Sequence, residues 1–143
     1  MRFLTDLLYA NGEPIYPADW IRVFAPRAGV WHHGVVTQMQ YLTEGLFTVE
    51  VAHNMKLTGI VTTDLADFGD IGQPVFLHRR PHPALVPEIS GRVRSALGKP
   101  YHLFAQNCEH FASFAHTGKA QSTSVNTVGL LTLGGVIIRL LAE

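Results

Sequence analysis

Five short segments with the residue pattern of β-strands follow one another between residues 19 and 80. In "DWIRVFAP" (19–26), Trp20, Arg22 and Phe24 alternate with Ile21 and Val23, the period that places successive side chains on opposite faces of a sheet. The other four segments are 29–40, 45–53, 58–65 and 73–80. Their connections have the length of hairpin turns, which join antiparallel strands. The order predicts one antiparallel sheet of about five short strands.

Helical patterns come after these strands. The proline-rich stretch 81–87 marks the change, and residues 87–98 then repeat apolar side chains at helical spacing, with Gly98 able to end the helix. A second helix is expected from Cys108 to Gly118. A short helix is also expected over residues 1–10. Strands followed by helices predict a segregated α+β domain, in which the sheet packs against the helices.

The 143 residues suit one ordinary domain. We expect an N-terminal segment at 1–13, a folded domain at 14–121 and a hydrophobic C-terminal segment at 122–143. The stretch from Ser122 to Ile138 contains no charged residue, but a membrane-spanning helix needs about 20 apolar residues. This stretch predicts either a helix packed on the domain or membrane contact through residues 127–142, and both interpretations stay open.

The composition excludes some classes of function. Eleven Lys and Arg residues balance eleven Asp and Glu residues, so no excess of positive charge favours a nucleic acid as partner. One cysteine cannot form an internal disulfide, which favours a reducing compartment. The first residues, "MRFLTDLLYANGEP", hold only a brief apolar stretch, so no secretory signal is expected. We therefore expect a cytoplasmic protein, with membrane association left open.

Cys108 is the only cysteine and stands at the expected start of a helix. Phe111, Ala112 and Ala115 follow at spacings that place the thiol on the buried helix face, with Asn107 as the cap. Free cysteines are often inert small hydrophobes, so one interpretation is core packing. The first turn of a helix also offers unpaired N–H groups and a positive dipole end, which favour a thiolate and can stabilise an oxyanion. The second interpretation is a nucleophile.

A nucleophilic cysteine needs a base, and histidine is the usual one. His110 and His116 share the expected helix with the thiol and point away from it. Neighbouring strand residues face opposite sides, so only one of His32 and His33 can serve. His53 ends a core-facing row, either as a satisfied core histidine or as a group that holds another imidazole in place. Two strands could thus offer a base and an orienting histidine, a Cys–His–His arrangement.

The motifs "NCEHFA" (107–112) and "HHGVV" (32–36) together resemble the lecithin:retinol acyltransferase-like family, the H-box/NC proteins. This family is a circularly permuted relative of the papain-like and NlpC-type cysteine hydrolases. The likeness runs from about "GEPIYPADWIRV" to "TGKAQ", more than two thirds of the chain. It implies a fold in which an antiparallel sheet packs on the helix that carries the cysteine.

The resemblance also implies the site residues. Cys108 would be the nucleophile and His32, two residues before a glycine, the base. His53, at the end of "VEVAH", would be the second histidine of the family. It follows His32 by 21 positions, a longer separation than the family pattern, so Gln38 and Gln40 are alternatives for this position.

The implied chemistry is acyl transfer. An acyl group would pass from a phospholipid or related ester to Cys108 as a thioester, then to water, an alcohol or an amine. Asn107, Gln106 or a backbone N–H would support the oxyanion. No cofactor is implied, and one cysteine is few for a structural zinc site. Two alternatives stay open: a peptidase or amidase like the NlpC-type relatives, and a non-catalytic interaction protein at membranes like some viral H-box/NC proteins.

Overall fold

A computed structural model describes residues 2–3, 9–44, 46–69, 73–100 and 108–119, which form one antiparallel sheet and two α-helices. The strands are β1 (Arg2–Phe3), β2 (Trp20–Ala25), β3 (Val30–Thr43), β4 (Leu46–Met55), β5 (Gly59–Asp64) and β6 (Val75–Arg79). They pair in the order β1-β4-β3-β2-β6, and β5 also pairs with β4. Every pairing is antiparallel. The α+β class and the five predicted strands are confirmed.

The prediction of a helix over residues 1–10 is wrong, because Arg2–Phe3 forms β1 and pairs with Leu46 and Phe47 of β4. An isolated helix of ten residues is marginal in water. The edge of β4 instead offers free backbone donors and acceptors to any extended segment that reaches it. Residues 4–8 lie outside the described part of the chain.

The two predicted helices are α1 (Val86–Ala96) and α2 (Cys108–Thr117). Two short 3-10 turns precede them in the chain: η2 (Leu65–Asp67) follows β5, and η3 (Pro83–Leu85) leads into α1. The glycine after α2, Gly118, has φ +78° and donates its N–H to the Phe114 carbonyl, the left-handed ending that glycine permits. Asn107, the expected cap of α2, and residues 122–143 lie outside the described ranges. No helix in the described ranges is long and apolar enough to cross a membrane.

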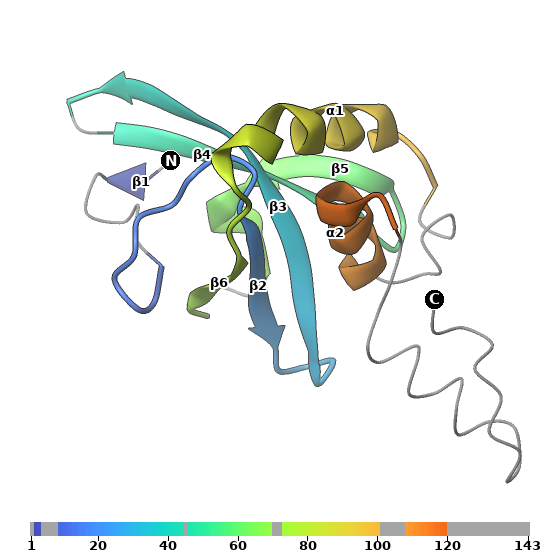
Figure 1. Cartoon of the computed structure of the whole chain (residues 1–143). Helices are drawn as coiled ribbons and strands as arrows, with labels where there is room; N and C mark the ends of the chain where they lie inside the picture. Colours follow the sequence, from blue (N-terminus) through green and yellow to red (C-terminus); the bar gives the residue numbers. More distant parts are fainter. Residues whose placement is uncertain (1, 4–8, 45, 70–72, 101–107, 120–143) are drawn as a thin grey trace, which may run out of the picture.

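Both faces of the sheet are covered, and period-two alternation divides its side chains between two core clusters. Figure 1 shows α1 and α2 on one face. The cluster on this face joins Trp20, Val35 and Ala52 to α1 and α2. The cluster on the opposite face is closed by η2 and the segment before β2. Its strand and η2-region members are Ile21, Val23, Val36, Val49, Val51, Leu65 and Phe68.

The ladder between β3 and β4 stops before β3 does. Its last pair is Gly34 with His53, and the segment of β3 from Val30 to His33 pairs only with β2. Beyond His53, β4 continues in its pairing with β5. Helix α2 packs against both β3 and β4. The edge of β3 beyond Gly34 therefore keeps backbone groups that no strand of the described chain uses.

Candidate active site

The thiol of Cys108 lies against this unpaired edge of β3. Its Sγ accepts a hydrogen bond from the backbone N–H of His33 at 3.3 Å, and the thiol donates to the Trp31 carbonyl oxygen at 3.7 Å. These two backbone groups flank His32 on either side. Phe111, Ala112 and Ala115 are fully buried, as the helical spacing predicted, and they fix the face of α2 that meets the sheet. The strand edge and the first turn of α2 together hold the sulfur beside His32.

His32 and His53 are in direct contact across the two strands. Nε2 of His32 lies 2.8 Å from Nδ1 of His53, and the two rings are almost perpendicular. Nε2 of His53 lies 3.0 Å from the hydroxyl of Thr63 on β5. Phe68 packs against both imidazoles. A line of polar groups thus runs from His32 through His53 to Thr63 across three neighbouring strands.

Gly34 makes this contact sterically feasible. It is the residue directly opposite His53, and it lies between His32 and Val36 on the same face of β3. A Cβ at this position would meet a methyl of Val51 at 2.6 Å and the ring of Phe68 at 2.8 Å. The absence of a side chain lets His53 reach diagonally to His32 and lets Phe68 close over both rings.

His33 faces the other side of the sheet, as strand alternation predicted for one member of the pair. Its Nδ1 accepts a hydrogen bond of 2.8 Å from the indole Nε1–H of Trp20. Its ring also contacts His78 on β6. Burial, and then the charges of His78, Arg22 and His32, lower the pKa of His33 to about 3. His33 therefore contributes a neutral side chain to the core and a backbone N–H to the sulfur.

Burial decides the charge state of the site. It lowers the pKa of His32, and burial followed by the charge of His32 lowers the pKa of His53 to about 4. The N–H groups of His33, Cys108 and Glu109 lower the pKa of the thiol, but burial outweighs them and raises it. The preference for a thiolate expected from the helix start alone is thus reversed. At neutral pH the thiol of Cys108 is therefore protonated, and the imidazoles of His32 and His53 are neutral.

The other candidates fall elsewhere. Gln38 and Gln40 lie on the exposed outer part of β3, opposite Glu50 and Thr48, and Gln38 donates to the Glu50 carboxylate at 3.3 Å. His53 is the residue in contact with His32. Asn107 and Gln106 lie outside the described residues. No group of three or more His, Cys, Asp or Glu residues suited to a metal ion occurs in the ranges that the structure describes.

His110 and His116 are buried on α2, and His116 bonds the carbonyl of Ala18 through Nε2 at 2.8 Å. This contact fixes α2 to the segment before β2. Sequence reasoning missed the contribution of Thr63, Trp20 and Phe68. Their placement depends on how strands distant in sequence pair, for which residue types give no signal.

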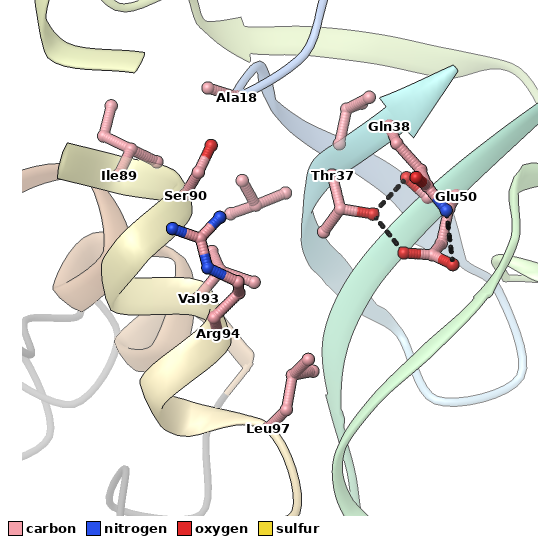
Figure 2. Close-up of a pocket in the computed structure, with 11 residues that line it drawn as sticks. Ala18, Thr37, Gln38, Glu50, Ile89, Ser90, Val93, Arg94 and Leu97 are labelled. Atoms are coloured by element: carbon pink, nitrogen blue, oxygen red, sulfur yellow. Dashed lines mark hydrogen bonds between the residues drawn. The ribbon is translucent and has the colours of Figure 1, made fainter. Parts of the chain in front are cut away.

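A hollow of about 200 Å³ lies between α1 and β3. Figure 2 shows Ile89, Val93 and Leu97 of α1 on one side of it. Thr37 and Glu50 lie on the other side and are joined by a hydrogen bond of 2.6 Å. None of Cys108, His32 and His53 lines this hollow. The candidate chemistry is therefore separate from it.

The structure is an α+β domain in which the edge of an antiparallel strand binds a cysteine at a helix start, on either side of a histidine that contacts a second histidine. The family model described as lecithin retinol acyltransferase matches residues 15–121. The match covers more than half of the chain, and the protein belongs to this family. Comparison with curated proteins and with solved structures gave no significant match. Membership indicates acyl-transfer or acyl-hydrolytic chemistry in general, on lipid substrates.

Proposed function

We propose that the protein is a cysteine-dependent acyltransferase or phospholipase that forms an acyl thioester on Cys108 from a phospholipid or related ester. The observation that carries this proposal is the position of the sulfur, bonded to the backbone on both sides of His32, while the His32 ring contacts His53. A nucleophile, a base and a group that orients the base are the three parts of such a centre.

In the first step, the sulfur attacks the ester carbonyl and its proton passes to His32. If His53 donates Nε2–H to Thr63, its Nδ1 accepts from Nε2–H of His32, and Nδ1 of His32 keeps the lone pair that takes the proton. The S–C bond forms, the ester C–O bond breaks, and the leaving alkoxide takes the proton back from His32. The products are the thioester and a lysophospholipid or other alcohol.

In the second step, the acceptor attacks the thioester. Neutral His32 removes a proton from water, an alcohol or an amine, the new acyl–O or acyl–N bond forms, and the S–C bond breaks. His32 then returns the proton to the sulfur. N–H groups in the first turn of α2 support the oxyanion of both steps in this proposal. No redox partner or cofactor is needed for this balance.

The charge state of the site supports a mechanism that begins from neutral partners. Because burial raises the pKa of Cys108 and lowers that of His32, the proton moves only as the new bond forms. When His32 becomes an imidazolium, the neutral Nδ1 of His53 accepts the hydrogen bond from its Nε2–H. This distinguishes the proposed centre from one that keeps a preformed thiolate–imidazolium pair.

Mass spectrometry of the intact protein after incubation with a short-chain phospholipid tests the proposal. We expect an added acyl mass on Cys108 in the wild type, greater accumulation when no amine or alcohol acceptor is present, and none in Cys108→Ala. His32→Ala should form the adduct about 10²–10⁴-fold more slowly. An adduct that persists in Cys108→Ala, or equal rates in His32→Ala and wild type, would refute the assignment.

A second function, binding of a partner at a membrane without catalysis, is favoured by the same upward pKa of the thiol. A protonated, half-buried cysteine is a good core residue and a poor free nucleophile. The mass experiment separates the two functions. Absence of any acyl mass across phospholipid, diacylglycerol and thioester donors would favour the binding function.

A further inference from the structure

The hairpin end of the sheet carries a group of exposed aromatic side chains next to the candidate site. Phe24 and Trp31 are paired across β2 and β3, and each is 37% exposed. The Trp31 ring contacts Phe24 and Phe76 edge to face, with ring centroids 5.3 Å and 5.9 Å away, respectively. We call Phe24, Trp31 and Phe76 the hairpin patch.

The hairpin patch lies on the face of the sheet that α1 and α2 cover farther along the strands. Phe24 shares a face of β2 with Trp20, which packs in the core beneath the helices. In Figure 1, β2 and β3 extend beyond both helices at this end, so neither helix reaches their turn. The backbone carbonyl of Trp31 also accepts the hydrogen bond from the thiol of Cys108. The patch and the sulfur are therefore neighbours.

Positive charge accompanies these rings. The guanidinium of Arg22 lies 4.3 Å from the centre of the Trp31 ring, and Arg27 is exposed in the turn between β2 and β3. Residues 20–33 contain no Asp or Glu. Trp and Phe side chains favour the boundary between water and acyl chains, and nearby arginines favour anionic headgroups. This pairing of chemistry fits a lipid surface better than an acidic peptide, which would leave the rings in water.

We propose that the hairpin patch, with Arg22 and Arg27, docks the protein on an anionic phospholipid bilayer and brings Cys108 to the headgroup level. The inference rests on the proposed lipid chemistry, because it names the surface from which Cys108 would receive its substrate. A bilayer surface suits this arrangement because the hairpin patch alone would contact the lipid, and the sulfur of Cys108 lies next to the patch. Docking needs no chemical step, so it can be tested apart from acyl transfer.

The test is co-sedimentation of the full chain with phosphatidylcholine vesicles, with and without phosphatidylserine. We expect Phe24→Ser to weaken binding about tenfold. Arg27→Gln should weaken it about fivefold, and only on vesicles that contain phosphatidylserine. Tyr41→Ser is the matched control, because Tyr41 is an exposed aromatic residue at the opposite end of β3. Equal binding by Phe24→Ser and Tyr41→Ser would overturn the proposal.

Two further measurements separate this proposal from other occupants and from the proposed function. Cys108→Ala should bind vesicles as the wild type does, so loss of acyl transfer leaves docking intact. In the absence of vesicles, acrylamide should quench the fluorescence of Trp31 more strongly than that of Trp20. The Trp31→Phe variant identifies which part of the fluorescence comes from Trp31. Equal protection of both indoles would show that residues 122–143 or a second copy already cover the patch. Dissociation of a dimer by Phe24→Ser would show that the patch joins two copies.

Discussion

The imidazoles of His32 and His53 meet at 2.8 Å across two antiparallel strands, although 21 positions separate them in the chain. The contact is diagonal, because the residue opposite His53 is Gly34. Thr63 bonds the outer nitrogen of His53 and thereby couples the pair to a third strand. The proposed base is thus held by groups that packing has already fixed.

Replacement of His53 tests whether it orients His32. His53→Leu removes the acceptor at Nδ1, and we expect kcat/KM for a short-chain ester to fall about 100-fold. His53→Gln keeps an oxygen that can accept, so it should recover part of the loss. The acid limb of the pH–rate profile should also move. A purely structural role would lower the free energy of unfolding in His53→Leu without moving that limb.

Thiol reactivity tests the resting charge state. Because burial raises the pKa of Cys108, its thiolate fraction at pH 7 is smaller than that of an ordinary cysteine. Iodoacetamide should therefore alkylate the folded protein more slowly than the urea-unfolded chain, and the rate should still be rising above pH 9. His32→Ala should change this rate little. Fast alkylation at pH 6 that His32→Ala abolishes would instead indicate a thiolate–imidazolium pair.

Gly34→Ala tests the steric requirement beneath Phe68. A Cβ would lie 2.6 Å from a Val51 methyl, so one of these groups must move. We expect the free energy of unfolding to fall by about 1–3 kcal/mol in urea denaturation. Gly91→Ala in α1 is the matched control, since its Cβ meets nothing nearer than the end of Arg94 at 4.0 Å. The control should be neutral or stabilising by about 1 kcal/mol.

In a double-mutant cycle, Gly34→Ala should cost less stability when Val51→Ala is already present than in the wild type, because Val51→Ala removes the methyl that meets the new Cβ. A loss in Gly34→Ala that Val51→Ala does not relieve would place the cause in the backbone rather than in this contact.

His116 tests the response of the fold to acid. Burial lowers its pKa to about 4, so protons bind the unfolded state first as the pH falls. Its stabilising contribution is complete above pH 6.5 and is lost between pH 6.5 and 4, with a slope of about 1.4 kcal/mol per pH unit. His116→Gln can keep a donor to the Ala18 carbonyl but has no proton to bind. Urea denaturation at several pH values should show a shallower acid slope in the variant; an unchanged slope would assign the pH dependence to His33 and His53.

The sequence alone could predict which strand residues share a face, because period-two alternation holds whatever the pairing. It therefore separated His32 from His33 and placed His53 with Val49 and Val51. Helical spacing likewise predicted the buried face of α2. These are local properties, and local patterns were sufficient for them.

Other features depend on contacts distant in sequence. The partnership of Thr63 with His53 requires the register of β5 on β4, which no residue of either strand reveals by its type. The upward pKa of Cys108 depends on how much protein surrounds the sulfur, while the sequence showed only the helix start. The pairing of β1 needed a free edge on β4 that exists only in the folded sheet.

The β3–β4 hairpin has a consequence for how relatives of this chain can vary. Its pairs from Gly34 with His53 out to Thr43 with Leu46 form an arm that leads away from the sulfur. Lengthening or shortening both strands of that arm by equal amounts would alter the spacing of the two histidines along the chain and leave their separation in space intact. An unmatched insertion in one strand would turn one imidazole to the other face. Length differences among relatives should therefore occur in matched steps or be absorbed by bulges.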